Sequence, residues 1–302
     1  MATGPRRRDG MVGAGIDGEE DGGMNTEAPQ VPADALAEHT VVVTGASSGI
    51  GRAIAERLGG LGAHIWLAGR DLEAMEAAAA AIREAGGQAE ARSVDLSQAA
   101  AVQGLVEEAH GMTGRFDIMV NNAGLGYTDP IVSGHPEQWR EMFEVNVLAL
   151  LVGCQAAVKA IRLSGTPGWI VNISSTAALR ADSGVYGATK HAVNCICASL
   201  RRELQAEPIR VVNVMPGPIA TNFARNLQPE LVEGFAEAAG LDIDFQPGQK
   251  LPEEALVELH GRMRDYIGHP DDVARAVVFA VTQPVEIGID EIVVRPARSL
   301  EL

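Results

Sequence analysis

Tyr186 and Lys190 are the two side chains in this sequence whose types and spacing suit proton chemistry best. They stand four positions apart in a stretch with helical periodicity, so they would share one helix face. A free tyrosine has a pKa of about 10 and is a poor base at neutral pH, but a neighbouring ammonium group favours the phenolate. Lowering that pKa to about 7 requires roughly 4 kcal/mol, which a partly buried lysine and one further positive charge would supply. The pair therefore predicts a tyrosine that donates and accepts a proton.

A glycine-rich turn supplies a second kind of chemistry. Residues 44–51 read TGASSGIG, follow a β-branched run and open a helical stretch. Glycines at such a turn let a pyrophosphate approach the backbone N–H groups at the positive end of a helix. One such turn is weak evidence alone, and its spacing is TGxxxGxG rather than GxGxxG. The turn predicts a site for a dinucleotide.

These groups need a scaffold that brings strand ends together, and the pattern of the chain predicts one. From residue 39 onward, short β-branched runs alternate with helical stretches. Near-continuous apolar strands in this alternation indicate a parallel sheet covered by helices on both faces. We therefore predict an α/β fold, a single doubly wound (Rossmann) domain with a seven-stranded parallel sheet. The predicted strands are 40–45, 63–68, 88–94, 117–121, 168–173, 209–214 and 288–294, and the predicted helices between them are 50–60, 72–85, 98–111, 136–163, 184–205 and 270–282.

Two regions fall outside this rhythm. Residues 1–38 are Gly-rich and charged without periodicity, so we expect a disordered N-terminal tail followed by the domain at 39–302. Residues 217–268 separate the sixth strand from the last helix and contain predicted helices at 228–239 and 252–267. Long excursions at the carboxyl end of a sheet often form lids or binding loops. We expect this one, with the loop 125–135, to roof an apolar or mixed substrate pocket that includes the side chains of Tyr127, Phe223, Leu227, Phe235 and Phe245.

Composition excludes several classes of function. The 302 residues contain 24 Lys and Arg against 40 Asp and Glu, a formal net charge of −16, which argues against binding to nucleic acid or to an anionic membrane surface. The longest apolar run, 147–158, is broken by Gln155 and falls short of the roughly 20 residues that span a bilayer. Cys154, Cys195 and Cys197 have neither disulfide-framework nor zinc-site spacing. We expect a cytoplasmic protein without a metal site.

Four motifs occur in order and at suitable distances. They are the glycine-rich turn, Asn121-Asn122-Ala123-Gly124, Tyr186-Gly-Ala-Thr-Lys190 and Pro216-Gly217-Pro-Ile-Ala-Thr221. Together they resemble the short-chain dehydrogenase/reductase family over about residues 39–296. The stretch from Pro270 to Pro296 further resembles the branch of NADP-dependent 3-hydroxy acid dehydrogenases and related carbonyl reductases. The resemblance implies an oxidoreductase that acts on CH–OH groups.

The resemblance assigns roles to individual side chains. It implies Tyr186 as the general acid or base, Lys190 as the charge that adjusts it, and Ser175 as the hydrogen-bond donor to the substrate oxygen. Ser174 is the alternative serine, because Ser175 lies 11 positions before Tyr186, about two fewer than is usual in the family. Asn146 matches the fourth active-site residue, which would bend its helix locally and hold a water linked to Lys190.

The same resemblance implies the cofactor contacts. At the end of the second strand an NAD enzyme usually has an acidic residue for the ribose 2′-hydroxyl, but here Gly69 stands there and Arg70 follows. A guanidinium suits a 2′-phosphate, and Asp71 is expected to cap the following helix instead. We therefore predict NADP, with NAD as the alternative. The expected contacts are Gly45, Ser47, Ser48, Gly49, Ile50, Gly51, Arg70, Asp95, Leu96, Asn122, Ala123, Gly124, Tyr186, Lys190, Pro216, Gly217, Ile219 and Thr221.

The sequence thus predicts an NADP(H)-dependent oxidoreductase that transfers hydride between nicotinamide and a small carbonyl or secondary alcohol substrate. The alternatives are an NAD-preferring alcohol dehydrogenase of the same fold and a dinucleotide-binding sensor without catalysis. The family resemblance also implies a homodimer or homotetramer, with the helices at 136–163 and 184–205 as its interface.

Overall fold

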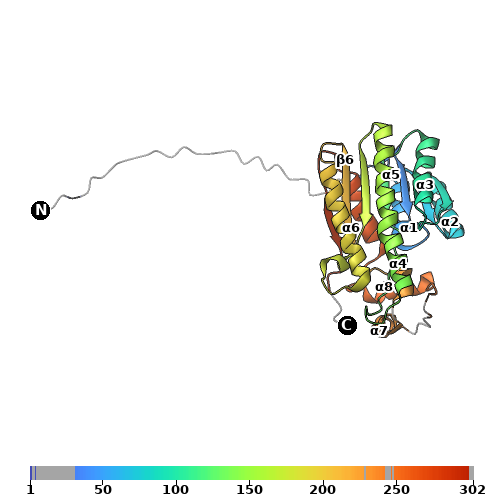
Figure 1. Ribbon diagram of the computed structural model, residues 1–302, viewed down its shortest axis with the longest axis vertical. Coiled ribbons are helices and arrows are strands. Elements are labelled where there is room, and N and C mark those ends of the chain that lie inside the picture. The colour runs from blue at the N-terminus through green and yellow to red at the C-terminus, as the bar shows by residue number, and fades with distance from the viewer. Residues whose placement is uncertain (2–3, 5–30, 228, 242–245, 247, 299–302) are drawn as a thin grey trace, which may run out of the picture. The chain divides into compact units, whose positions relative to one another are not determined.

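The computed structural model describes residues 1, 4, 31–227, 229–241, 246 and 248–298, and within them a seven-stranded sheet forms the centre. Its strands are β1 Thr40–Thr44, β2 His64–Gly69, β3 Gln88–Ser93, β4 Ile118–Asn121, β5 Gly168–Ile173, β6 Ile209–Pro216 and β7 Glu291–Val294 (Figure 1). Every pair of neighbouring strands is parallel, in the order β3-β2-β1-β4-β5-β6-β7. The predicted doubly wound domain is confirmed, and its winding reverses between β1 and β4.

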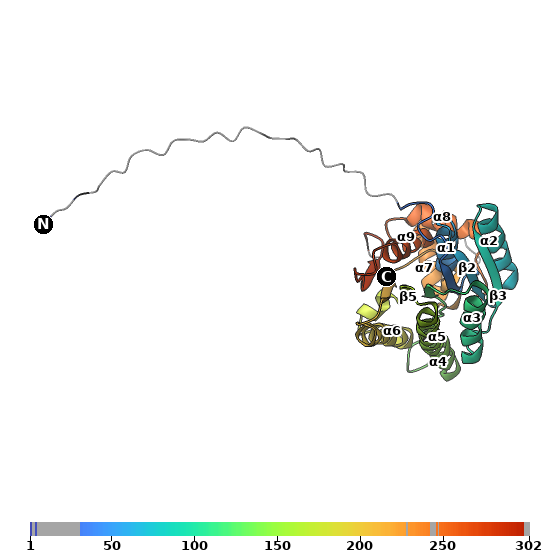
Figure 2. The same cartoon turned by 90° about the horizontal axis from the view of Figure 1, so that it is seen from above.

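Helices cover both faces of this sheet: α1 Gly49–Gly59, α2 Leu72–Glu84, α3 Ala99–Thr113, α5 Ala149–Ser164, α6 Gly184–Glu203 and α9 Pro270–Val281. The central strands are apolar on both sides, as a doubly covered parallel sheet requires. In β1, Val41 and Val43 belong to the buried cluster of α1, α2 and α9, whereas Val42 belongs to the cluster of α3, α5 and α6. Figure 2 shows these helices in two layers on either side of the strands.

One predicted helix, 136–163, is divided in the structure. Helix α4 spans Pro136–Phe143, a π-helical turn follows at Glu144–Leu148, and α5 continues from Ala149. A π-turn inserts one extra residue into the helical ladder and turns the side chains within it. Here it directs the side chain of Asn146 onto the backbone of Leu125. The α-helix is therefore interrupted at Asn146, the position at which the sequence predicts a local bend.

The same helical run bears on the membrane question. By length and composition alone, Pro136–Ser164 would be apolar enough to span a bilayer, with a mean hydropathy of 1.6 in its most apolar window. This differs from the expectation that no such stretch exists, because the π-turn joins α4 and the apolar α5 into 29 continuous helical residues. Half of that window is buried inside the fold, where Cys154, Ala157 and Ile161 pack beneath the sheet. The run serves as a core helix.

The folded region begins before the predicted boundary at residue 39. Leu36 is 2% exposed and belongs to the core cluster of α1, and its N–H donates to the carbonyl of Leu61. Residues 32–38 therefore pack against the domain because they carry an apolar side chain that fills its core. The rest of the predicted tail, 2–3 and 5–30, lies outside the described residues, as does the C-terminal end of the predicted domain, 299–302.

The excursion between β6 and α9 lies over the carboxyl ends of the strands. It contains a 3₁₀ turn at Asn222–Asn226, helix α7 at Pro229–Ala239 and helix α8 at Glu253–Met263. Helix α8 ends at Met263, four residues before the predicted end of this helix at residue 267. The chain leaves the helical path there because Gly268 pairs with Ile219 in a β-bridge. The Gly268 N–H donates to the Pro218 carbonyl, and the Ala220 N–H donates to the Gly268 carbonyl.

Candidate active site

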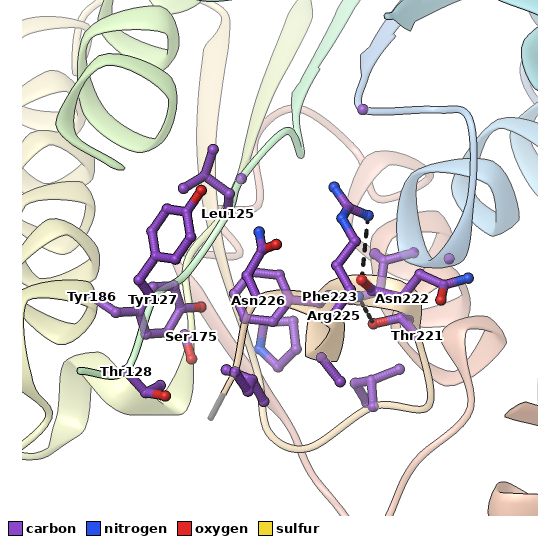
Figure 3. A pocket seen from close by; sticks show the side chains of 18 of the residues that line it. Leu125, Tyr127, Thr128, Ser175, Tyr186, Thr221, Asn222, Phe223, Arg225 and Asn226 are labelled. Carbon is purple, nitrogen blue, oxygen red and sulfur yellow. Dashed lines mark hydrogen bonds between the residues drawn. The ribbon is translucent and has the colours of Figure 1, made fainter. Parts of the chain in front are cut away.

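A cavity of about 1180 Å³ opens at the carboxyl ends of the strands, where the winding of the sheet reverses. Figure 3 shows Ser175 and Tyr186 on one side of it and Thr221, Asn222 and Arg225 on the other. Of the predicted catalytic residues, Ser175, Tyr186 and Lys190 line the cavity and Asn146 lies behind its wall. Every predicted cofactor contact also lines it: Gly45, Ser47, Ser48, Gly49, Ile50, Gly51, Arg70, Asp95, Leu96, Asn122, Ala123, Gly124, Pro216, Gly217, Ile219 and Thr221.

The glycine-rich turn forms a cradle that side chains would fill. Gly49 has a φ of +56°, which favours glycine. A Cβ on Gly51 would lie 2.4 Å from both Asn122 Nδ2 and the Gly45 carbonyl. Helix α1 starts here with no side-chain cap from Ser48 and no acidic residue in its first turn. The N–H groups at the start of α1 are therefore left for an anionic ligand, and the turn fits the pyrophosphate of a dinucleotide.

Thr44 and Asn122 tie this turn to the one after β4. The N–H groups of Asn122 and Ala123 each donate to Thr44 Oγ1 at 3.1 Å. Asn122 Nδ2 in turn donates to the carbonyls of Thr44 at 2.9 Å and Gly45 at 3.2 Å. The two motifs that the sequence placed 78 positions apart thus form one rigid wall of the cavity.

The opposite wall carries the tyrosine and its serine. Tyr186 lies in the first turn of α6 and forms a side-chain hydrogen bond with Ser175, while its ring packs against Phe223 with centroids 5.4 Å apart. Burial raises the pKa of Tyr186 to about 12, and the bond with Ser175 offsets only part of this. The sequence predicts a lowered pKa from Lys190 together with one further positive charge, whereas in the protein alone burial shifts the pKa upward. Loss of hydration is the larger cause of this shift, and Lys190 Nζ lies 5.9 Å from the ring centre.

Lys190 lies one turn further along α6 and is 4% exposed. Its Nζ donates to the Ile173 carbonyl at the end of β5, at 2.9 Å. Burial lowers the pKa of Lys190 to about 8. At neutral pH this lysine therefore keeps its charge but is close enough to neutrality to exchange a proton.

The two candidate serines have different surroundings. Ser174 is 3% exposed, and its hydroxyl lies 3.2 Å from the Lys190 carbonyl and 2.7 Å from Asn194 Oδ1. Ser175 Oγ instead accepts from the Ala177 N–H at 3.1 Å and reaches Tyr186. Ser175 is thus the serine whose hydroxyl faces the tyrosine, and Ser174 braces the backbone of α6.

Asn146, 1% exposed, uses its whole amide to fix the cavity wall. Its Oδ1 accepts from the Leu125 N–H at 2.9 Å, and its Nδ2 donates to the Leu125 carbonyl at 2.8 Å and to Thr189 Oγ1 at 3.0 Å. Thr189, a residue the sequence did not single out, donates to the Tyr186 carbonyl. A Cβ on Gly124 would stand 3.3 Å from Asn146 Oδ1 and 3.4 Å from Lys190 Nζ, so both polar atoms lie beside the same glycine.

At the other end of the cavity, Arg70 and its neighbours surround the carboxyl end of β2. Asp71 caps α2 as predicted, with its Oδ1 accepting from the Ala74 N–H at 3.2 Å. Hydrogen bonds from Ser97 lower the pKa of Asp95, and the charge of Arg70 adds to this. A cation and two short acidic side chains therefore share this end of the cavity.

Other lining residues come from positions to which the sequence assigned no role. Glu141 accepts a hydrogen bond from the Tyr127 hydroxyl at 2.8 Å, and Arg225 and Lys250 reach the cavity from the excursion. Tyr127, Phe223, Leu227 and Phe235 line the cavity as predicted, whereas Phe245 lies outside the described residues. No local motif marks Arg225 or Lys250, because contacts with distant elements bring them here.

In the part of the chain that the structure describes, no three His, Cys, Asp or Glu side chains gather as metal ligands. Cys154 and Cys197 are buried, Cys195 is exposed, and all three are free thiols. The groups that line the cavity are phenols, hydroxyls, ammonium and guanidinium groups, backbone N–H groups and separate carboxylates. Such a set can bind phosphates and transfer a proton to or from an oxygen atom.

Comparison with known proteins agrees with this chemistry and shows the family. The family model for short chain dehydrogenase matches residues 39–231. An uncharacterised oxidoreductase of Methylorubrum extorquens is 38% identical over 241 residues, covering 79% of this chain and 88% of its own. A metagenomic short-chain oxidoreductase solved in complex with NADP is 31% identical, with a TM-score of 0.66 over 87% of this chain and 98% of its own. A short-chain dehydrogenase/reductase from Burkholderia phymatum in complex with NAD is 27% identical, with a TM-score of 0.70 over 86% and 89% of the two chains. The chain therefore belongs to the short-chain dehydrogenase/reductase family and is an NAD(P)-dependent oxidoreductase.

Proposed function

We propose that this protein is an NADP(H)-dependent oxidoreductase of small carbonyl compounds and secondary alcohols, with Tyr186 as its general acid and base. One observation carries the proposal: the Tyr186–Ser175 pair, with Lys190 behind it, faces the same cavity as the glycine-rich turn. A dinucleotide held by that turn would extend toward the tyrosine.

The roles of the side chains follow from this geometry. When bound, a dinucleotide would supply hydride to the carbonyl carbon in reduction and accept it in oxidation. Ser175 donates a hydrogen bond to the substrate oxygen and stabilises the negative charge that develops there. Tyr186, protonated at neutral pH because burial raises its pKa to about 12, donates its proton to that oxygen.

Lys190 and Asn146 act behind the tyrosine. The Lys190 ammonium stabilises the phenolate that remains after proton transfer, and its pKa of about 8 allows it to take part in returning the proton. Asn146 holds the backbone of Leu125 and the hydroxyl of Thr189, so it fixes both sides of the pocket around Lys190. A protonated resting tyrosine favours carbonyl reduction as the working direction.

Arg70 supports NADP as the preferred cofactor. It lines the cavity directly after β2, where Gly69 leaves no acidic side chain to accept from a ribose 2′-hydroxyl. The alternative is NAD preference, which Asp71 beside Arg70 and the NAD complex of the Burkholderia relative favour. Catalytic efficiency with NADPH and NADH separates the two, and Arg70→Asp is expected to invert a preference for NADPH.

The lining residues suggest an uncharged substrate with apolar parts, because Phe223, Leu227, Val232 and Phe235 face the cavity together with Tyr186.

We propose a cytoplasmic homodimer or homotetramer, with α4–α5 and α6 at the interface. On that helical run Phe143, Leu148 and Leu151 are 44%, 48% and 42% exposed, which is the kind of apolar face that a second copy would cover.

The test is turnover followed at the cofactor, as loss of NADPH with ketones and as formation of NADPH from NADP⁺ with hydroxy acids and steroid-like alcohols, compared between wild type and Tyr186→Phe. The phenylalanine removes one hydroxyl, so we expect unchanged NADPH affinity and a catalytic efficiency lower by about 10²–10⁴-fold. A Tyr186→Phe protein that turns over as fast as wild type would refute the assigned role. A wild-type protein that binds NADPH and turns over none of these compounds would instead favour the sensor alternative.

A further inference from the structure

Lys250 reaches the nucleotide end of the cavity from the excursion that covers the substrate end. Its Nζ donates to Asp71 Oδ2 at 2.5 Å across 179 positions of sequence. Asp71 directly follows Arg70, and all three residues line the cavity. The hydrogen bond from Lys250 is the main cause of the lowered pKa of Asp71. A cation from the excursion thus pairs with the carboxylate that directly follows Arg70, the residue expected to bind the 2′-phosphate.

The backbone around Lys250 is fixed at both sides. Asn222 binds Leu251 with two hydrogen bonds, from Leu251 N–H to Asn222 Oδ1 at 2.7 Å and from Asn222 Nδ2 to the Leu251 carbonyl at 3.3 Å. The Gly248 N–H donates to the Arg225 carbonyl at 2.8 Å, and Leu251 is buried. We call residues 248–251 the strap. Since the strap is anchored on either side of Lys250, its backbone keeps this lysine at the end of the cavity where Asp71 lies.

The charges at this end explain why a second cation matters. A 2′-phosphate carries a charge of about −1.5 to −2 at neutral pH. Arg70 alone would face it with the Asp71 carboxylate one residue away, and Ser48 gives no charge in the glycine-rich turn. Lys250 pairs with Asp71 and so brings a second cation to the carboxyl end of β2. Its side chain is 50% exposed, so it can turn from Asp71 to a phosphate oxygen at little cost.

We propose that Lys250 is a second cationic ligand of the cofactor 2′-phosphate and so selects NADP over NAD. The inference rests on the proposed NADP dependence. It adds that the selecting lysine belongs to the strap. Because Asn222 holds the strap and directly follows Thr221, occupation of the phosphate site also stabilises the segment that covers the substrate end.

The test is titration calorimetry with two fragments, adenosine 2′,5′-bisphosphate and adenosine 5′-monophosphate, which differ in the 2′-phosphate. We expect Lys250→Gln to weaken binding of the bisphosphate about fivefold, with the monophosphate changed less than twofold. Lys159→Gln is the matched control, since Lys159 on α5 forms a comparable exposed ion pair with Glu107 on α3, and neither residue lines the cavity. The Tm of each variant reports that it is folded.

Two further variants separate the interpretations. Asp71→Asn keeps a good N-cap and removes the competing charge, so bisphosphate binding should hold or strengthen. If Asp71→Asn and Lys250→Gln both weaken the binding of the two fragments to the same extent, Lys250 serves only to hold the strap against Asp71. The inference is then overturned. If Lys250→Gln behaves as Lys159→Gln while Arg70→Gln loses bisphosphate affinity, the inference fails and NADP preference stands. If wild type binds both fragments equally, NADP preference itself fails, and the inference fails with it.

Discussion

Replacing Lys190 with methionine should separate the stability of this protein from its catalysis. Lys190 is 4% exposed, and burial lowers its pKa from the ordinary 10.5 to about 8. Between these values the unfolded chain binds more protons than the folded one. The free energy of unfolding therefore rises with pH across this window, and the charged lysine destabilises the fold below it.

The size of the effect follows from the two pKa values. Their difference corresponds to about 3 kcal/mol of lost stability near pH 7. Methionine has a similar volume and no charge, but it leaves the Ile173 carbonyl without the Nζ donor, at a cost of about 1–2 kcal/mol. We expect Lys190→Met to be more stable than wild type by about 1–2 kcal/mol near pH 7, and to lose carbonyl reduction.

Urea unfolding at about pH 7 and about pH 9.5 measures the difference in free energy of unfolding between Lys190→Met and wild type. This difference should shift by about 2 kcal/mol in favour of wild type at the higher pH. Taking the difference between the two proteins cancels the other titrating groups. Lys159→Met serves as a control, because Lys159 has a side chain that is 63% exposed and should give no such shift. A gap between wild type and Lys190→Met that stays constant with pH would refute the argument that burial controls this lysine.

Three other expectations follow from particular contacts. Ser174→Ala should lower stability by about 1–2 kcal/mol in denaturant unfolding and spare turnover. Ser175→Ala should lower kcat about 10²-fold and cost less stability than Ser174→Ala, because its hydroxyl caps only a short 3₁₀ turn. The reverse result would exchange their roles. Asn146→Ala leaves the buried N–H and carbonyl of Leu125 without partners, and should cost about 2–4 kcal/mol in the same assay; a loss below about 0.5 kcal/mol would contradict it. Leu36→Ala should cost about 2–4 kcal/mol if the domain begins before residue 39, and nothing if these residues are a free tail.

The sequence alone was enough for the features that depend on local chemistry. β-branched runs such as 40–44 form buried strands because their side chains fit a doubly covered sheet, and every predicted strand is present. The glycine-rich turn was readable because only glycine suits its positive φ at Gly49 and its close approach at Gly51. Lys190 and Tyr186 share a helix face because helical periodicity alone brings them together.

Tertiary structure decided what depends on burial and on contacts between distant segments. Which serine faces Tyr186 followed from how the end of β5 leaves the sheet, with Ser174 turned onto Asn194 and Ser175 into the cavity. The raised pKa of Tyr186 followed from desolvation, which depends on everything packed around the phenol. Lys250 reached Asp71 only because the chain folds back over 179 positions. Local patterns specify side-chain type and periodicity, whereas hydration and long-range contacts exist only once the chain has folded.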